Sequence, residues 1–198
     1  MRAAANLLFL LAILAIDLRA AGLVVMIIGP PGSGRSTQAE ILRKDRGMLV
    51  IAADDLIARN REKFERFRNP TIQGVDVHLD PALNQLVAEA LTTADLSKGV
   101  VLDGYPAAKT QGDYLAGLRE KLNLTQAIVI HLQVPDDVVR KRLSGLQAAD
   151  LDQRLKDYHR ELDFAHTYFP EANIHDIDGT RKREAVAKAI RKVLEQTR

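Results

Sequence analysis

Residues 23–37 read LVVMIIGPPGSGRST, and this stretch decides the fold of the chain. Its first part, Leu23 to Ile28, is a short apolar run without alternation, which is typical of a parallel strand covered on both faces. The second part, Gly29 to Thr37, fits the pattern G-x-x-x-x-G-K-[ST], except that Arg35 stands in place of lysine. The stretch therefore predicts a strand, a glycine-rich loop that binds phosphate, and a helix that begins near Ser36.

The glycine-rich loop can hold an anion because its backbone turns tightly and presents successive N–H groups to one point. The helix that follows directs the positive end of its dipole at the same point. We expect the nucleotide phosphates to contact Gly29, Pro30, Pro31, Gly32, Ser33, Gly34, Arg35, Ser36 and Thr37. Arg35 departs from the pattern, since a planar guanidinium replaces a compact ammonium. We therefore expect that arginine at this position preserves nucleotide binding better than it preserves the rate of a reaction at the bound phosphates.

Four further apolar runs are rich in β-branched residues and indicate buried strands. They are Met48 to Ala52, Val100 to Leu102, Ala127 to Leu132 and Asn173 to Ile177. Helical patterns separate them, such as the apolar steps Leu151, Leu155 and Tyr158. Alternating strands and helices connect through right-handed crossovers. The chain therefore predicts an α/β fold of the P-loop NTPase type, with a doubly wound five-stranded parallel sheet and helices on both faces.

The composition is that of one ordinary globular domain and excludes several kinds of site. The 198 residues are 46% hydrophobic and 27% charged, with a formal net charge of +2. This charge is too small to indicate nucleic-acid binding. The chain has no cysteine, and therefore no disulfide or thiolate site, and its five histidines show no metal-ligand spacing. We expect a monomer without a nucleic-acid partner and without a stable membrane span.

The N-terminal segment 1–22 has two interpretations. Arg2, the apolar run Leu7 to Ile16 and the small residues Ala20 to Gly22 are arranged as in a secretory signal peptide. The run is too short to span a bilayer. Cleavage at this point would leave almost no spacer before the first strand, so an upstream start-site extension is the alternative. The protein would be exported or periplasmic in the first case and cytoplasmic in the second.

Two motifs resemble those of adenylate kinase and its nucleoside-monophosphate kinase relatives. One is the phosphate loop with its continuation Thr37 to Glu40, and the other is Val100 to Pro106, which reads VVLDGYP. The resemblance extends from the first strand to the C-terminus. It implies that Asp103, at the end of the third strand, holds the water shell of Mg²⁺ together with Ser36. It also implies that Gln111 reads the adenine of AMP.

The same resemblance assigns further positions around the two nucleotides. The segment Ala53 to Leu56 is similar to the one that opens the AMP-binding helices, which places Asp55 near the metal as well. Arg142 and Arg154 match arginines beside the ATP phosphates, and Gly179 lies in a turn against the ATP adenine. The implied acceptor-binding residues are Asp55, Arg59, Gly104, Tyr105 and Gln111. The implied catalytic residues are Arg35, Asp103, Arg142 and Arg154.

Several arginines of the family pattern are missing. Ala107 and Ala58 stand where arginines that contact the AMP phosphate are expected. Arg59 and Lys109 are candidate substitutes, although a helical Arg59 would point about 100° away from position 58. Residues 144–151 replace the arginine-bearing lid. Exclusion of water over the phosphates is therefore expected to be incomplete.

These observations predict one nucleotide-kinase domain over residues 23–198, with an acceptor-binding helical insertion at 53–97 and a shortened lid at 144–151. Its predicted function is transfer of the γ-phosphoryl group of ATP to a nucleoside monophosphate, AMP in the first place, with Mg²⁺. Two alternatives stay open, namely a nucleotide-binding protein with weak or no catalysis and a P-loop kinase for another small acceptor. The presence of Asp103 and Gln111 favours the nucleoside-monophosphate kinase. The missing arginines favour the nucleotide-binding protein, and the arginine-rich acceptor region favours a kinase for another acceptor.

Overall fold

The computed structural model describes residues 22–62 and 79–197. The predicted signal peptide or extension, apart from Gly22, lies outside these residues, as does part of the predicted insertion. Five parallel strands form one sheet in the order β2-β3-β1-β4-β5. They are β1 (Leu23–Ile28), β2 (Leu49–Ala52), β3 (Val100–Asp103), β4 (Gln126–Gln133) and β5 (Ile174–Asp178). The predicted α/β fold is confirmed, and each strand corresponds to one of the five apolar runs.

The central strand β1 shows why the strand sequences lack alternation. Val24, Met26 and Ile28 belong to one apolar core, whereas Val25 and Ile27 belong to another. All five side chains are at most 2% exposed. A parallel strand that is buried on both faces needs apolar residues at every position. The absence of alternation in the sequence therefore reflects a sheet covered on both sides.

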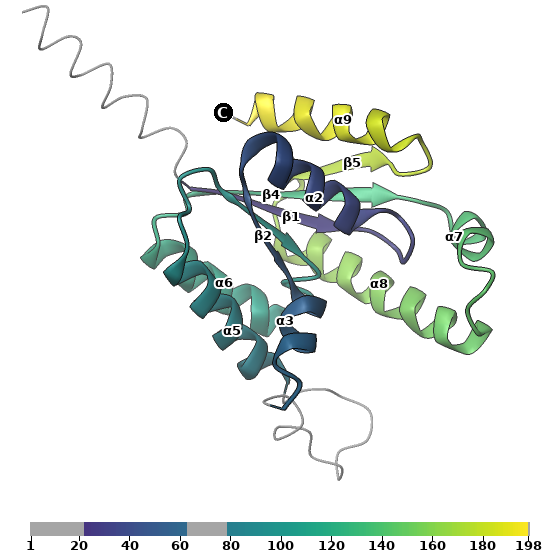
Figure 1. Cartoon of the computed structure of the whole chain (residues 1–198), viewed down its shortest axis with the longest axis horizontal. Coiled ribbons are helices and arrows are strands. Elements are labelled where there is room, and N and C mark those ends of the chain that lie inside the picture. The colour runs from purple at the N-terminus through teal and green to yellow at the C-terminus, as the bar shows by residue number, and fades with distance from the viewer. Residues whose placement is uncertain (1–21, 63–78, 198) are drawn as a thin grey trace, which may run out of the picture.

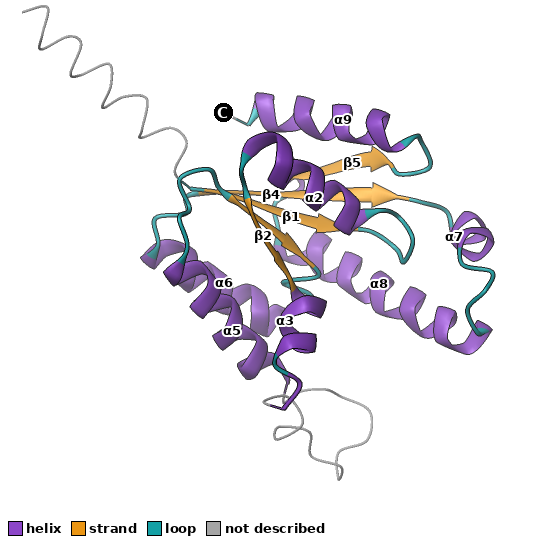
Figure 2. Cartoon of the chain, in the orientation of Figure 1, coloured by secondary structure: helices purple, strands orange, loops and turns teal. Residues whose placement is uncertain are grey.

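Helices cover the two faces of the sheet (Figure 1), and Figure 2 shows the strands between the two helical layers. The first layer is α2 (Arg35–Arg46) and α9 (Arg183–Gln196), whose apolar side chains share one core cluster. The second layer contains α5 (Leu79–Thr93), α6 (Lys109–Lys121) and α8 (Ala148–Tyr168), which share the other. The shorter elements are α3 (Ala53–Arg59), α7 (Asp136–Arg142) and the 3-10 turn η1 (Glu171–Asn173). The sheet is therefore doubly wound, as the sequence predicts.

The carboxyl ends of the strands meet at one edge of the sheet. The arrows of β1, β4 and β5 point the same way in Figure 1, and the phosphate loop follows β1 at that end. Ile27 of β1 pairs with Asp103 of β3, and Ile28 pairs with His131 of β4. Ligands of open α/β sheets bind outside the carboxyl ends of the strands, where the strand order reverses. The loop between β1 and α2 lies at this point, because β1 has β3 on one side and β4 on the other.

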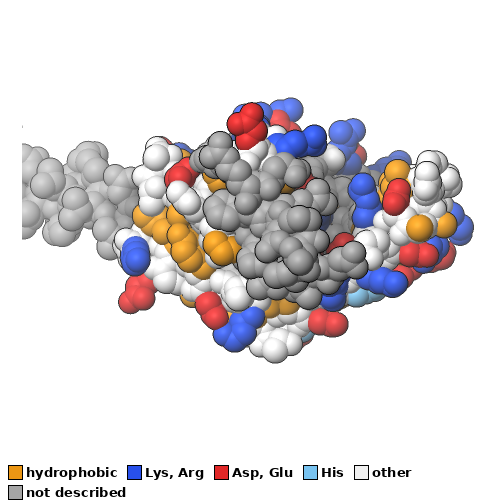
Figure 3. All heavy atoms as spheres, turned by 90° about the horizontal axis from the view of Figure 1, so that it is seen from below, with side chains coloured by type: hydrophobic (Ala, Val, Ile, Leu, Met, Phe, Trp, Pro, Cys, Tyr) orange, Lys and Arg blue, Asp and Glu red, His pale blue; other side chains and the backbone are white. Residues whose placement is uncertain are grey.

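The described surface carries charges of both signs. Figure 3 shows Lys and Arg side chains beside Asp and Glu side chains on the visible face, with apolar side chains between them. In the part of the chain that the structure describes, no helix combines the length and the hydropathy needed to cross a bilayer. The visible face presents mixed charge rather than an extended field of one sign, in agreement with the net charge of +2.

Candidate functional site

Two glycines fix the path of the phosphate loop between β1 and α2. Gly34 has a φ of 95°, a conformation that only glycine adopts without strain. A Cβ atom at Gly29 would approach the Ser33 hydroxyl to 2.7 Å, so a side chain there would displace the loop. The Ser33 N–H donates to the Pro30 carbonyl at 3.0 Å and closes the turn. Because α2 begins at Arg35, its first N–H groups lack intrahelical acceptors and can bind an anion.

A cavity of about 750 Å³ opens beside this loop. The whole predicted loop, Gly29 to Thr37, lines one side of it. Its other lining residues come from α3, the segment after β3, the connection between α7 and α8, and α8 itself. They are Asp54, Ala107, Leu143, Leu146, Arg154, Asp157, Tyr158 and Glu161. Small-molecule sites commonly enclose roughly 300–1,000 Å³, so the cavity has the size for a nucleotide.

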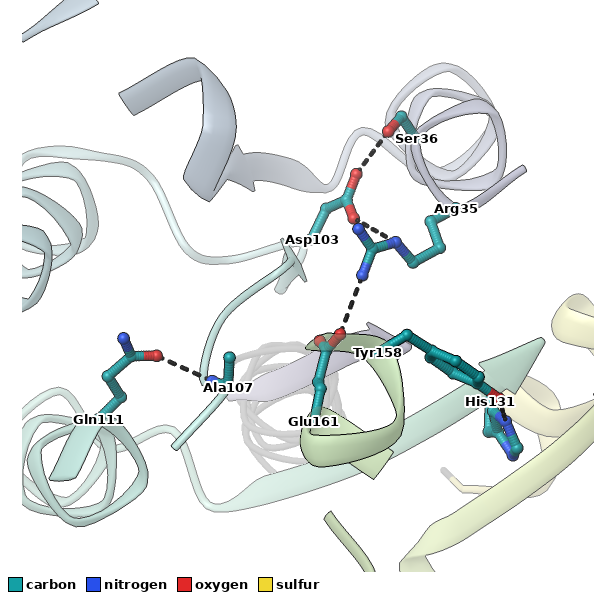
Figure 4. Close-up of polar contacts among 8 residues, drawn as sticks. All are labelled: Arg35, Ser36, Asp103, Ala107, Gln111, His131, Tyr158 and Glu161. Atoms are coloured by element: carbon teal, nitrogen blue, oxygen red, sulfur yellow. Dashed lines mark hydrogen bonds and ion pairs between the residues drawn. The ribbon is translucent and has the colours of Figure 1, made fainter. Parts of the chain in front are cut away.

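Ser36 and Asp103 form a hydrogen-bonded pair where the loop meets the end of β3. The Ser36 hydroxyl donates to Oδ2 of Asp103 at 2.7 Å (Figure 4). Asp103 is 6% exposed, and its Oδ1 accepts no hydrogen bond within the described residues, although Nε of Arg35 lies 3.4 Å away. A hydroxyl beside a buried, under-satisfied carboxylate is a donor set that suits a hard cation.

The rest of the site offers few further metal ligands. Residues 22–62 and 79–197 contain no cluster of three or more Asp, Glu, His or Cys side chains that could hold a metal ion. Mg²⁺ usually keeps several waters and takes one or two protein ligands together with substrate phosphates. The Ser36–Asp103 pair therefore fits Mg²⁺ that arrives with a nucleotide.

Arg35 lies between two carboxylates (Figure 4). Its Nη1 donates to Oε2 of Glu161 at 3.2 Å, and its Nε faces Asp103. Glu161 extends from α8 and is 8% exposed. Burial raises the pKa of Glu161 from 4.5 to about 7, and the Arg35 charge opposes this rise only in part. The Arg35 guanidinium is therefore paired with a protein carboxylate on each side, Glu161 and Asp103.

Two further predicted arginines approach the loop from the second half of the chain. Arg142, the last residue of α7, donates to the Gly32 carbonyl at 3.0 Å and to the Gly179 carbonyl at 3.1 Å. It thereby ties the phosphate loop to the turn after β5. Arg154 is exposed on α8, lines the cavity, and has no ion-pair partner among the residues that the structure describes. Arg154 is therefore able to bind a ligand phosphate.

The predicted acceptor residues on α3 are not brought into the cavity. Asp55 and Arg59 form an exposed ion pair with a 3.8 Å separation along the helix. The neighbouring carboxylate, Asp54, lines the cavity instead. Successive residues of a helix point about 100° apart, so only one of the two aspartates can face the site. The structure thus places Asp54 where the sequence analysis expected Asp55.

The segment after β3 reaches the cavity at Ala107, whereas the predicted acceptor residues Gly104, Tyr105 and Gln111 are not among the residues that line it. Gly104 has a φ of 74°, which lets the chain turn away from the sheet. The buried Tyr105 donates its hydroxyl hydrogen to Oδ1 of Asn84 at 2.6 Å. The Ala107 N–H donates to Oε1 of the buried Gln111 at 2.8 Å. The cavity is therefore lined here by the methyl group of Ala107, at the position where an arginine was expected.

The connection between α7 and α8 is short and carries leucines. It runs over residues 143–147, and residues 148–151 already belong to α8. Leu143 and Leu146 line the cavity, and Leu146 is 40% exposed. Lys109, a candidate substitute for a missing acceptor arginine, does not line the cavity either, and its Nζ pairs with Oδ2 of Asp113 on the surface of α6 at 2.6 Å. Within the described residues, the segment 144–151, predicted as a shortened lid, thus contributes the apolar side chain of Leu146 to the cavity lining and no arginine.

A buried histidine connects α8 to the sheet. His131 of β4 is 5% exposed, with Nε2 2.8 Å from the Tyr158 hydroxyl and Nδ1 2.7 Å from Oδ1 of Asp176. Burial raises the pKa of Tyr158 to about 12, so its hydroxyl keeps the proton at neutral pH. The hydrogen bond between the Tyr158 hydroxyl and Nε2 of His131 therefore joins the helix that carries Arg154 and Glu161 to the sheet.

Sequence reasoning did not find Glu161, although the sequence holds a sign of it. Leu151, Leu155 and Tyr158 form the apolar stripe of α8, and Glu161 continues this stripe at helical spacing. Glutamate is almost never fully buried unless it is paired. A carboxylate on a stripe of core residues therefore indicates a partner from another element, although not which one.

A glycine-rich loop between a parallel strand and a helix, with a serine–aspartate pair at the strand edge, defines a P-loop phosphate-binding α/β protein. The adenylate kinase family model matches residues 27–174, and the chain belongs to the adenylate kinase family. This is a family of ATP-binding kinases of nucleotide metabolism, so the resemblance seen in the sequence is confirmed.

Bacterial adenylate kinases are similar to nearly the whole chain. The chain is 29% identical over 181 residues to the adenylate kinase of Tropheryma whipplei (strain Twist), covering 86% of this chain and 97% of that protein. The adenylate kinase of Micrococcus luteus is 28% identical over 181 residues, with coverages of 84% and 87%. That of Leuconostoc mesenteroides is 29% identical over 181 residues, with coverages of 86% and 96%. The residues that the family model matches, 27–174, include the phosphate loop, Asp103 and α8.

Proposed function

We propose that this protein transfers the γ-phosphoryl group of ATP to a nucleoside monophosphate, with AMP as the first candidate acceptor and Mg²⁺ as cofactor. The observation that carries the proposal is the Ser36–Asp103 pair beside a phosphate loop, in a chain of the adenylate kinase family. Phosphoryl transfer needs a donor and an acceptor held in line and positive charge around the transferring oxygens. In this proposal the residues of the site provide these elements, and no protein base is required.

In this proposal the loop and Arg154 bind the ATP phosphates, and Arg142 holds the loop in place. The backbone N–H groups of Gly29 to Thr37 and the N-terminal end of α2 surround the phosphates. Arg154 reaches the transferring group from α8, since it is exposed and lines the cavity. Arg142 holds the loop against the turn at Gly179, where the ATP base would lie. Arg142 thus orients the loop, whereas Arg154 stabilises charge in the transition state.

Ser36 and Asp103 would hold Mg²⁺, largely through water. When bound, the ion neutralises charge on the phosphate oxygens. Asp54 is better placed than Asp55 to take part, because Asp54 lines the cavity and Asp55 is paired with Arg59 on the surface. The metal ligands of this proposal are therefore Ser36 and Asp103, with Asp54 as the second carboxylate.

The acceptor is assigned to the side of the cavity formed after β3. Ala107 lines this side, and its N–H donates to Oε1 of Gln111, which is buried and does not itself line the cavity. The phosphate of the acceptor would meet no arginine at positions 58 and 107. We therefore expect a high KM for AMP, because a charge-assisted hydrogen bond to phosphate is about twice as strong as a neutral one.

Nucleotide binding with very slow transfer is the second candidate function. The alanines at positions 58 and 107 remove cations from the acceptor side, and Arg35 is engaged by Glu161 and Asp103. An arginine supplied to a phosphoryl-transfer transition state is worth about 10³–10⁵ in rate. A protein that lacks several of them would bind ATP and turn it over slowly.

Acceptor-dependent transfer from labelled ATP tests the proposal. The full chain is incubated with ATP, Mg²⁺ and AMP, CMP, UMP or GMP, beside an Asp103→Asn variant of nearly the same shape. Labelled diphosphate that forms with one acceptor and is lost in the variant supports the proposed kinase. ATP binding without transfer to any acceptor contradicts it and supports the second candidate.

A further inference from the structure

Arg35, the cationic side chain of the phosphate loop, forms ion pairs with two carboxylates of the protein. Arg35 uses Nη1 for Glu161 and turns Nε toward Asp103, at 3.2 Å and 3.4 Å. Glu161 comes from α8, and its side chain is 10% exposed. Among the described residues, Arg35 is the one residue whose side chain forms a hydrogen bond with the Glu161 carboxylate. Glu161 is therefore directed at the loop and has no other described structural partner.

The same guanidinium is expected to serve the nucleotide. Glu161 lines the cavity together with Arg35 and the loop glycines, so a bound polyphosphate would occupy the space that these groups face. A guanidinium has one positive charge and a limited fan of N–H donors. Each donor that binds Glu161 is withheld from a phosphate oxygen. Two anions, one from the protein and one from the ligand, therefore compete for one cation.

We infer that Glu161 is a positioning residue that competes with the ATP phosphates for Arg35 and thereby sets the affinity of the loop for ATP. The inference rests on the proposed function only in taking a nucleotide polyphosphate as the ligand of the loop. Asp103 is committed to Ser36 as well as to Arg35, so Glu161 is the carboxylate that can release the arginine without disturbing the metal pair.

Other charges around Glu161 favour this exchange. Asp103 at the end of β3 and Asp54 on α3 both act on Glu161 as like charges, and Arg35 on α2 is its opposing charge. Phosphate oxygens at the loop would add further negative charge and would draw the guanidinium away. Removing the carboxylate at position 161 should therefore free Arg35 for the ligand.

Titration calorimetry with Mg·ATP on the full chain tests the inference in a double-mutant cycle. Glu161→Gln keeps the shape of the side chain and should tighten ATP binding by about tenfold, as expected for the loss of one charge-assisted competitor. In an Arg35→Ala background the same substitution should change affinity by less than about threefold. Glu161→Asp, with a shorter reach, should give an intermediate affinity. In steady-state kinetics the gain should appear in KM for ATP rather than in kcat.

Asp163→Asn is the matched control. Asp163 lies on the same helix, is exposed and is not among the residues that line the cavity. Removing its charge should change ATP affinity by less than about threefold and equally in both backgrounds. A tightening by Glu161→Gln that persists in Arg35→Ala would be a general charge effect and would overturn the inference.

The remaining outcomes separate this inference from the proposed function. Unchanged or weaker ATP binding by both Glu161 variants overturns the inference alone. If the ATP affinities of the double-mutant cycle change as expected but the protein phosphorylates no acceptor, the inference is supported and the proposed kinase activity is contradicted. Absence of ATP binding in the wild type and in every variant overturns both.

Discussion

Replacing Glu161 by Gln is expected to stabilise the folded protein at alkaline pH. Glu161 lies on the buried face of α8, and burial raises its pKa from 4.5 to about 7 in spite of the ion pair with Arg35. Each pKa unit corresponds to about 1.4 kcal/mol, so ionising this carboxyl in the folded state costs about 3 kcal/mol. Glutamine resembles the protonated acid and avoids this cost.

The sign of the pH dependence follows from the direction of the pKa change. Below about pH 4.5 the carboxyl is protonated in both the folded and the unfolded protein, and it adds no penalty. As pH rises through 4.5 and then 7, the unfolded state loses its proton first, and the folded state is progressively destabilised. Above pH 7 the full cost of about 3 kcal/mol applies. The variant lacks this titration.

Urea unfolding of the wild type and of Glu161→Gln between pH 4 and pH 8 measures the effect. The variant should exceed the wild type by about 3 kcal/mol at pH 8, or about 6–12 °C in Tm, and by little at pH 4. Asp157→Asn, an exposed substitution on the same helix, should stay within about 0.5 kcal/mol of the wild type throughout. A difference between Glu161→Gln and the wild type that is constant with pH, or that favours the wild type at pH 8, would refute the reasoning.

Three further substitutions test other parts of the site. Gly34→Val forces a β-branched residue into a φ of 95° and should lower ATP affinity by at least about tenfold in a binding titration; unchanged affinity would contradict the assigned loop. Tyr158→Phe leaves Nε2 of the buried His131 without its hydrogen-bond partner and should cost about 1–3 kcal/mol in urea unfolding; an unchanged free energy of unfolding would contradict a stabilising role of this contact. Arg142→Lys should raise KM for ATP several-fold more than it lowers kcat, because an ammonium does not reproduce the planar fork that binds two carbonyls. A fall in kcat alone would instead place Arg142 on the transferring group.

The fold could be read from the sequence because its strands and loop are local features. Leu23 to Ile28 is apolar at every position, and the glycine loop follows without a gap, so the strand, the turn and the helix were each marked in consecutive residues. The resemblance to adenylate kinase also implied that Ser36 and Asp103 act together. The strand order, which makes β1 and β3 neighbours and brings the two residues to one edge of the sheet, came from the structure.

The parts of the site that escaped sequence analysis depend on packing angles. Asp54 and Asp55 are adjacent, and only the rotation of α3 about its axis decides which of them faces the cavity. Glu161 and Arg35 are 126 residues apart, and their contact depends on how α8 lies across the sheet. One contact that holds α8 against the sheet is the hydrogen bond between Tyr158 and the buried His131, and no spacing in the sequence encodes it. Contacts between distant elements therefore had to come from the structure.

Two irregularities of the sequence are explained together by one contact. The phosphate loop has arginine in place of lysine, and the apolar stripe of α8 contains a glutamate. A guanidinium can bind carboxylates through Nε and Nη1 at the same time, whereas an ammonium is a point charge at the end of a flexible chain. Arg35 can therefore stabilise a buried Glu161 while it stays beside Asp103. A buried Glu161 would be unfavourable without Arg35, because removing the partner of a buried charge costs about 3–5 kcal/mol, whereas the Arg35 side chain is 25% exposed and keeps Asp103 beside it. The arginine of the loop and the glutamate of α8 thus form one ion pair, which joins the helix to the phosphate loop.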